Sequence, residues 1–577
     1  MDAHWIPIPR PGGAYLVLVL AALACGSSRA QVLSHQKISD TQGGFAGTLD
    51  VVDFFGQALA CLGDLDGDGV ADLAVGSHFD GDGGTKRGAV WIVFLQGDGT
   101  VKAEQKISDL FGGFGGVLAA GDVFGSSLAA LGDVDGDGVQ DLAVGAPDDD
   151  DGGSARGAVW ILFLNADGTV KAEQKLSSSS GGLVGPLDDA DLFGSSLAAL
   201  EDLDGNGVRE LAVGARGDDD GGMDRGAVWV LSLAANGTVV DEQKISAVAG
   251  GFGGALVDRD AFGASVAHVG DLDGDGVGEL AVGSLELGFL GKHPTGPPSA
   301  GAVWILSLNA DGTVKAELEI GEAQGGFTGA LDVLDRFGAA VAALGDLDGD
   351  GIGDLAVGAP CDDDGGATSL AERGSVWLVF LDGGGSVRGQ TKISDTEGSF
   401  QGMLDNFDRF GSSVTAVGDL DGNGVVDLAV GAPDDDDGGS AHGAVWLLFL
   451  GPTAPAVEVV RLGDPPNPPA FLAGATSGPV IGAVWDPLVS PFHPGAFLDV
   501  AWVSLQPQNQ PSAAGTILCD PPMPGLLFTS PPGVPFQLAI PLQSGLVGAS
   551  FCTQGGSLGT GSSLALANAL DITVGTF

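Results

Sequence analysis

Residues 124–177 read FGSSLAALGDVDGDGVQDLAVGAPDDDDGGSARGAVWILFLNADGTVKAEQKLS, and this stretch decides the fold because it recurs along the chain. Its Phe-Gly pair is found six times, in steps of 69, 69, 69, 75 and 73 residues, at Phe55, Phe124, Phe193, Phe262, Phe337 and Phe410. Six of the nine tryptophans keep the same spacing: Trp91, Trp160, Trp229, Trp304, Trp377 and Trp446. Self-similarity of this kind indicates a repeat architecture in which each unit packs on its neighbours.

Each repeat predicts four short strands. In the quoted stretch they are SSLAALGD, VQDLAVGAP, GAVWILFL and VKAEQKLS, separated by turns rich in Gly and Asp, and NADGT indicates a hairpin between the last two. A four-stranded sheet with two apolar faces must be covered on both sides, and radial stacking of such sheets provides that cover. We therefore predict an all-β fold, a β-propeller of four-stranded blades.

The phase of the repeats favours a closed ring. Residues 35–39 (HQKIS) resemble the fourth strand of a repeat (EQKIS) but precede the first Phe-Gly pair, and the sixth repeat ends after its third strand, at Leu450. The N-terminal strand is expected to complete the sixth blade, which would remove two exposed sheet edges. Six blades are predicted over residues 31–450.

An acidic nonapeptide lies between the first and second strands of every repeat, DLDGDGVAD at 64–72 and its counterparts at 133–141, 202–210, 271–279, 346–354 and 419–427. Side-chain oxygens occupy loop positions 1, 3, 5 and 9 in all six, and position 7 offers a backbone carbonyl. The predicted metal ligands are Asp64, Asp66, Asp68, Val70, Asp72, Asp133, Asp135, Asp137, Val139, Asp141, Asp202, Asp204, Asn206, Val208, Glu210, Asp271, Asp273, Asp275, Val277, Glu279, Asp346, Asp348, Asp350, Ile352, Asp354, Asp419, Asp421, Asn423, Val425 and Asp427.

Calcium suits this pattern because it takes six to eight oxygens at flexible distances, whereas magnesium requires a stricter octahedron. The EF-hand shares D-x-D-x-D-G but needs a Glu at position 12, where the first two loops have Val75 and Val144. A metal-free Asp-Gly turn is the alternative for any single loop. Six loops in the same phase favour about six Ca2+ ions.

The repeats resemble the FG-GAP repeats of integrin α-subunit propellers, over about residues 31–450. The Phe-Gly pair, the Asp loop and a Gly-Ala-Pro at 145–147, 358–360 and 431–433 occur in the family's order, whereas residues 76–78, 214–216 and 283–285 lack the proline. Integrin propellers have seven blades, so the resemblance leaves a seventh open. It implies calcium-stabilised adhesion or ligand binding.

The formal net charge of −53 argues against nucleic acid and against anionic membrane surfaces as partners. Further acidic runs follow the second strands, at 148–151, 218–220, 362–364 and 434–437, on the face opposite the Asp loops. In the resembling family this is the ligand side. Such a face favours cationic partners or calcium-bridged glycans, and a merely solvated acidic rim is the alternative.

Residues 1–30 are predicted to be a signal peptide, with the apolar run 14–24 before a small-x-small cleavage site at 28–30; lipidation at Cys25 is the alternative. No later run is long and apolar enough to suggest a membrane span. We therefore expect a secreted or cell-surface protein. Residues 451–577 hold seven charged groups and short apolar runs that suggest a small β-sandwich-like domain, with an anchoring or a structural role.

Seven histidines and one tyrosine leave few candidates for acid–base chemistry, and none of the histidines occurs in a Ser-His-Asp or Gly-x-Ser-x-Gly context. We expect a non-enzymatic protein that binds an extracellular protein or glycan. The alternatives are a calcium-dependent glycan-active enzyme and a purely structural cell-surface component.

Overall fold

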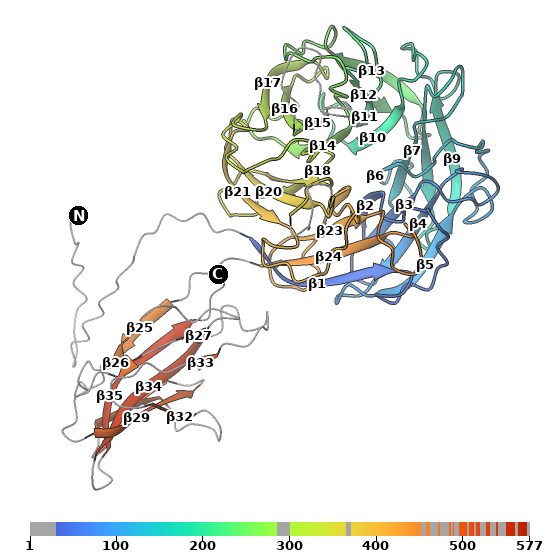
Figure 1. Cartoon of the computed structure of the whole chain (residues 1–577). Coiled ribbons are helices and arrows are strands. Elements are labelled where there is room, and N and C mark those ends of the chain that lie inside the picture. The colour runs from blue at the N-terminus through green and yellow to red at the C-terminus, as the bar shows by residue number, and fades with distance from the viewer. Residues whose placement is uncertain are drawn as a thin grey trace. The chain divides into compact units, whose positions relative to one another are not determined.

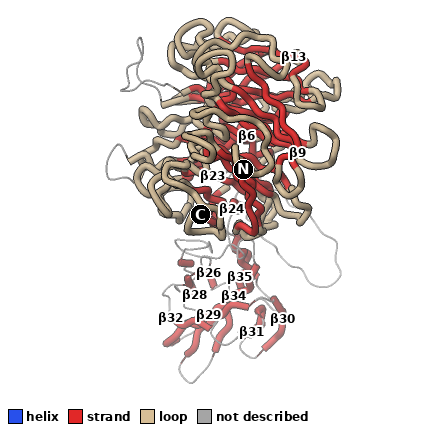
Figure 2. The backbone as a smooth tube through the Cα atoms, turned by 90° about the vertical axis from the view of Figure 1, so that its right-hand side faces the viewer, coloured by secondary structure: helices blue, strands red, loops and turns tan. Residues whose placement is uncertain are grey.

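The computed structural model describes residues 30–285, 300–364 and 371–451 in full, and the backbone of the strands between residues 457 and 573. The chain separates into one compact unit, Arg29–Pro452, and a second that contains Thr453–Phe577. Every regular element in the described residues is a strand (Figure 2). None of the described residues form a helix that could cross a membrane. The predicted signal peptide lies outside the described residues.

The first unit is a ring of six four-stranded antiparallel sheets, each running from the inside of the ring outward (Figure 1). The first three blades are β2 (Ala58–Gly63), β3 (Asp72–Ser77), β4 (Ala89–Leu95), β5 (Val101–Ile107); β6 (Ser127–Gly132), β7 (Asp141–Ala146), β8 (Ala158–Leu164), β9 (Val170–Ser177); and β10 (Phe193–Ala199), β11 (Arg209–Ala215), β12 (Ala227–Leu233), β13 (Val239–Ser246). The next two are β14 (Ser265–Gly270), β15 (Glu279–Ser284), β16 (Ala302–Leu308), β17 (Val314–Ile320); and β18 (Ala340–Gly345), β19 (Asp354–Ala359), β20 (Ser375–Leu381), β21 (Val387–Ile393). The predicted propeller of four-stranded blades is confirmed, and the blades number six.

The sixth blade combines the two ends of the ring. Its strands are β22 (Ser413–Gly418), β23 (Asp427–Ala432), β24 (Ala444–Gly451) and the N-terminal β1 (Gln31–Ser39), which pairs antiparallel with β24. His35 lies opposite Leu448 in this register, and Figure 1 shows β1 along the outer edge of that blade. The expected closure by the N-terminal strand is confirmed.

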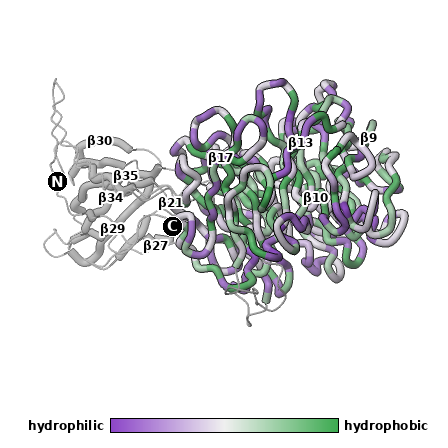
Figure 3. The backbone as a smooth tube through the Cα atoms, turned by 90° about the horizontal axis from the view of Figure 1, so that it is seen from above, coloured by the Kyte–Doolittle hydropathy of each residue, from purple (hydrophilic) through white to green (hydrophobic). Residues whose placement is uncertain are grey.

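Burial along each strand follows its place in the blade. The second and third strands, such as β7 and β8, are buried at every residue because neighbouring blades cover both faces. The fourth strand, such as β9, exposes the residues in its middle. Figure 3 shows hydrophobic residues gathered along the strands and hydrophilic ones in many of the turns.

Neighbouring blades meet at backbone distance. A Cβ added to Gly76 of the first blade would lie 2.0 Å from the carbonyl oxygen of Gly125 in the second. The same clash, at 2.0 Å, arises between Gly431 of the sixth blade and Gly56 of the first. The peptide N–H of Phe55 also donates to the carbonyl of His442 at 3.0 Å across that junction. The Phe-Gly and Gly-Ala pairs are therefore the contact points between blades, and the closing junction is built like the others.

Aromatic side chains fill the space beside these contacts. Phe114, from a GGF segment, packs on Phe124 at a ring-centroid distance of 5.2 Å and on Trp160 at 5.0 Å. Four further blades repeat this trio with Phe45, Phe252, Phe327 and Phe400. The regular spacing of Phe and Trp in the sequence thus reflects one aromatic cluster repeated between blades.

The second unit is also built of strands, and only their backbone is described. The strands are β25 (Val457–Arg461), β26 (Phe471–Leu472), β27 (Val484–Trp485), β28 (Leu488–Val489), β29 (Ala496–Ser504), β30 (Pro507–Ser512), β31 (Gly515–Cys519), β32 (Leu527–Ser530), β33 (Leu538–Ala539), β34 (Ser550–Gly559) and β35 (Leu564–Thr573). Five of them form an antiparallel sheet in the order β25-β35-β34-β29-β32. This agrees with the β-rich domain expected after residue 450.

Replacing Ile38 with alanine tests the closure. Ile38 is 1% exposed in β1, and its counterpart Ile107 in β5 is 0% exposed. Each Ile→Ala change is expected to cost about 2–5 kcal/mol of unfolding free energy, because both leave a cavity between blades. Denaturant unfolding measures the cost, and a neutral Ile38→Ala beside a costly Ile107→Ala would contradict closure by β1.

Candidate metal centres and the opposite face of the ring

The six acidic loops share one local structure. In the first loop, Asp64 accepts hydrogen bonds from the peptide N–H groups of Asp68 and Gly69, both at 2.8 Å. Gly67 and Gly69 have φ values of 80° and 91°, a region that glycine adopts without strain. The sixth loop repeats the arrangement, with Asp419 bound at 2.8 Å by the N–H groups of Asn423 and Gly424. The position-1 carboxylate is thus fixed by the peptide N–H groups of loop positions 5 and 6.

The position-9 carboxylate is held from the strands. Asp72 begins β3, is 0% exposed, and accepts from the N–H groups of Leu65 and Leu95, both at 3.0 Å. Asp427 does the same in the sixth blade. Burial raises the pKa of Asp427 to about 7 and that of Asp354 in the fifth loop to about 6. A buried carboxylate of this kind is stabilised in its charged form by a nearby cation.

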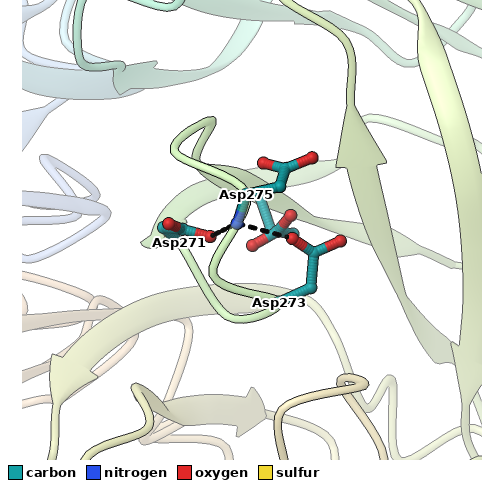
Figure 4. A group of neighbouring side chains, drawn as sticks. Asp271, Asp273 and Asp275 are labelled. Atoms are coloured by element: carbon teal, nitrogen blue, oxygen red, sulfur yellow. Dashed lines mark hydrogen bonds between the residues drawn. The ribbon is translucent and has the colours of Figure 1, made fainter.

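The carboxylate oxygens converge in the way that a metal site requires. In the fourth loop, one oxygen from each of Asp271, Asp273, Asp275 and Glu279 lies within 4.8 Å of the others. Figure 4 shows Asp271 and Asp273 around the peptide nitrogen of Asp275. The N–H of Asp275 donates a hydrogen bond to each of the two carboxylates, at 3.1 Å. The Oε1 atom of Glu279 is buried and has no hydrogen-bond partner. This orphaned oxygen and its neighbours could hold a cation.

Positions 1, 3 and 9 come together in the same way in the first, second, third and fifth loops: Asp64, Asp66, Asp72; Asp133, Asp135, Asp141; Asp202, Asp204, Glu210; Asp346, Asp348, Asp354. The residue at position 7 donates its peptide N–H to the position-5 side chain, as from Val70 to Asp68 at 2.9 Å. The other position-7 residues, Val139, Val208, Val277, Ile352 and Val425, make the same bond. The structure therefore groups three of the predicted positions in these loops and four in the fourth loop.

The position-5 aspartates have a basic partner that the sequence analysis missed. Lys102, the second residue of β5, forms ion pairs with Asp66, at 2.8 Å, and with Asp68. Lys171, Lys315 and Arg388 occupy the equivalent place in the second, fourth and fifth blades and pair with positions 3 and 5 of their loops.

The other two loops lack both the aspartate and the base. The third has Asn206 at position 5 and Val240 in place of the lysine, and the sixth has Asn423 and Leu33. The first, second, fourth and fifth loops have four carboxylates and one base, which gives a formal charge of −3. The third and sixth loops have three carboxylates and an asparagine, which gives the same charge. A comparison of the six repeats with one another would have revealed this pairing from the sequence.

The acidic runs on the opposite face are pinned by a second lysine. Lys175 of β9 bridges Asp149 and Asp151, both at 2.7 Å, and its ammonium lies 5.3 Å from the ring centroid of Trp160. Lys37, Lys106, Lys244 and Lys392 make the equivalent double bridges in four other blades. Each lysine therefore offsets one of the negative charges of its acidic run and fixes two of its aspartates within the blade.

The fourth blade supports this link between lysine and acidic run. Glu319 takes the lysine's place opposite Trp304, and the same repeat has LELGFLGKHPTGPPSA at 285–300 instead of the run. Residues 286–299 lie outside the described residues. Lysine and run are thus lost together, as expected of two halves of one structural contact.

An aspartate lies two residues before the Phe-Gly pair in each repeat, and it is buried in five of the six. Asp408 is 4% exposed and accepts from the N–H of Asp405 at 2.7 Å. Burial, with the negative charge of Asp435, raises the pKa of Asp408 to about 7, and burial raises that of Asp335 likewise to about 7. These carboxyl groups are turn-fixing acceptors whose ionised form is unfavourable.

The change Asp408→Asn tests the pH dependence. An unfolded aspartate has a pKa of about 3.9, so between that value and about 7 only the folded chain binds this proton. Stability of the parent relative to Asp408→Asn should therefore fall as pH rises from 5 to about 8, levelling above the folded pKa. Thermal melts at saturating calcium measure the difference, because effects of the metal loops cancel between the two proteins. A difference that stays constant with pH would contradict the assignment.

The FG-GAP repeat family model matches residues 55–93, 124–162, 193–231, 262–306, 337–379 and 410–448. The chain is 34% identical to integrin alpha-4 of Xenopus laevis over 174 residues, which is 30% of this chain and 15% of the relative. It is 37% identical to integrin alpha-PS5 of Drosophila melanogaster over 167 residues, 29% of this chain and 15% of that one.

A phosphatidylinositol-glycan-specific phospholipase D of Bos taurus is 33% identical over 181 residues, 31% of this chain and 20% of the relative. The chain thus matches a minor part of these relatives. A subtype N11 neuraminidase-like protein of a bat influenza virus covers 73% of this chain and 95% of its own, at 9% identity and a TM-score of 0.36, too low to carry an argument. The six family matches coincide with the six blades, and the chain belongs to the FG-GAP repeat proteins, with an integrin alpha-like propeller.

Proposed function

We propose that this protein is a secreted or cell-surface propeller that binds calcium in each blade and mediates adhesion or ligand binding. The observation that carries the calcium assignment is the donor set of the six loops. It consists of oxygen alone, with three or four carboxylates converging in each of the first five loops. Hard oxygen ligands in this number favour Ca2+ over the transition metals, which prefer nitrogen or sulfur.

The proposed calcium ions have a structural role. Each loop joins the first and second strands of a blade. In the first, second, fifth and sixth blades its position-9 carboxylate is also tied to the third strand through Leu95 or an equivalent. A dissociation constant of about 10⁻⁴ M, typical of extracellular modules, would give about 1.4 kcal/mol per site at about 1 mM calcium. Six such sites would contribute on the order of 8 kcal/mol, comparable with the stability of a whole domain.

The proposed partner is an extracellular protein or glycan, and the propeller acts without catalysis. Support comes from the integrin alpha relatives and from the acidic charge, which disfavours nucleic acid. The phospholipase D relative is an enzyme by name. Incubation with glycans, with product analysis, separates the binding role from a glycan-active one.

Removal of calcium tests the structural role. Excess EDTA should lower the melting temperature strongly and cooperatively, because all six loops would lose their counterion. Calcium titration of the stripped protein should restore it at about six ions per chain. Equal melting curves with EDTA and with calcium would refute the proposal.

A second test uses the base beside the loop. Lys102→Met leaves four carboxylates without their partner, so the chelated protein should melt at a lower temperature and gain more from calcium than the parent does. The double change Lys102→Met with Asp68→Asn recreates the chemistry of the third and sixth loops. It should return both readouts toward the parent values, and identical behaviour of the single and double variants would contradict the charge rule.

A further inference from the structure

A cavity of about 360 Å³ lies where the six blades meet, on the face of the acidic runs. The residue that follows the Gly-Ala or Gly-Ser pair of each blade lines it, so all six repeats contribute the same position: His78, Pro147, Arg216, Leu285, Pro360 and Pro433. The volume falls at the lower end of the range of small-molecule sites, about 300–1,000 Å³.

Proline in three blades shows what the fold needs at this position. The strand before it keeps its bounds and register without proline, as β3 before His78 and β7 before Pro147 show. β11, before Arg216, keeps the same register and begins one residue earlier. The propeller therefore does not require His78, Arg216 or Leu285 where they stand. These three residues differ from the proline of the other repeats, and they do so at the position where all six blades line one cavity.

Arg216 is the most unusual of the three. Its Nε is buried and has no hydrogen-bond partner, and no carboxylate of the described residues forms an ion pair with its guanidinium. Burial lowers the pKa of Arg216, with Asp148 opposing this effect and Arg336 adding to it. A guanidinium removed from water is costly unless a carboxylate pairs with it, and Asp148, whose charge acts on Arg216, forms no ion pair with it.

The other charged groups of the cavity are Arg336, Arg409, Asp148 and Asp434, with Lys86 close by. Arg409 is already paired, to Glu372 at 2.9 Å and to Asp434 at 3.2 Å. Arg336 lines the cavity from an exposed position and, like Arg216, has no ion pair with a described residue. Two guanidinium groups thus face the cavity without an ion pair.

The remaining wall suits a small polar molecule with an apolar side. Gln57 and Ser195 offer hydrogen-bonding groups, and Phe79 and Leu285 offer apolar surface. Burial, with the positive charges of Lys86 and Arg216, lowers the pKa of His78 to about 3, so its imidazole is neutral. The Nδ1 atom of His78 has no hydrogen-bond partner and adds a polar contact.

We propose that the central cavity binds a small anionic ligand, a carboxylate- or sulfate-bearing molecule of about monosaccharide size, through Arg216 and Arg336. The planar guanidinium forks match such oxyanions in two-point hydrogen bonds. This inference deepens the ligand-binding half of the proposed function by naming the chemistry of one ligand. It does not depend on the calcium assignment.

The repeats supply matched variants for the test. Arg216→Pro introduces the residue that three other blades have at this position. Arg336→Leu introduces the leucine that the third blade has at the equivalent position, Leu192, whose φ of 58° matches the 59° of Arg336. Asp148→Asn removes the carboxylate nearest Arg216. Arg225→Leu is the control, because Arg225 pairs with Asp258 on the same face and does not line the cavity.

Calorimetric titration of the full chain in calcium buffer would use glucuronate, glucose 6-sulfate and neutral glucose as probes. At least one acidic probe should bind with one-to-one stoichiometry, and glucose should not. Arg216→Pro and Arg336→Leu should each weaken binding roughly tenfold or more, as expected for a lost charge-assisted pair. Asp148→Asn should tighten binding, and Arg225→Leu should leave it unchanged.

Thermal melting separates this role from a structural one. Without ligand, Arg216→Pro should melt at or above the parent temperature, because it removes a largely desolvated charge that forms no ion pair with a described residue. A lower melting temperature would assign Arg216 to the fold and overturn the proposal. Failure of both acidic probes to bind, or binding that both arginine variants retain, would overturn it as well. An EDTA-sensitive melt alongside either result would leave the calcium proposal standing.

Discussion

The contact on which the rest of the structure depends is the backbone approach between neighbouring blades. The carbonyl of Gly125 lies where a side chain on Gly76 would begin, and the same is true between Gly56 and Gly431 where the ring closes. Any Cβ at these sites would push two blades apart. If one junction between blades were wider than the others, the junction that closes the ring could not form. The Phe-Gly and Gly-Ala pairs therefore recur because the ring closes only when every pair of neighbouring blades lies at the same distance.

Charge is organised blade by blade around this frame. On one face, carboxylates converge in the acidic loops, and a base or an amide brings each loop to the same formal charge. On the other face, a lysine stacked on tryptophan bridges two aspartates of the acidic run. The chain has 23 basic residues against 76 acidic ones, and these pairings place the bases where carboxylates lie close together.

Internal repetition makes departures informative. Where six copies agree, the residue serves the blade, as Gly76 and Trp160 do. Where two positions change together, as Asn206 with Val240, they serve one contact. Arg216, with a buried Nε that has no partner, stands where three other blades have proline, and its chemistry therefore requires an explanation beyond the fold.

By itself, the sequence determined the blade and the closing strand and favoured six blades, and the structure excluded a seventh in the described part of residues 31–450. The alternation of apolar runs and Gly-Asp turns is local, and the displaced HQKIS segment has only one open edge to complete. It also located the acidic loops, because their predicted ligands lie within nine residues of one another. Only the tertiary structure decided the pairings that do not recur from repeat to repeat, since Arg409 is 37 residues from Glu372 and 25 from Asp434. The central cavity likewise exists only once six blades have closed, because each contributes one side chain from a position that is unremarkable within its own repeat.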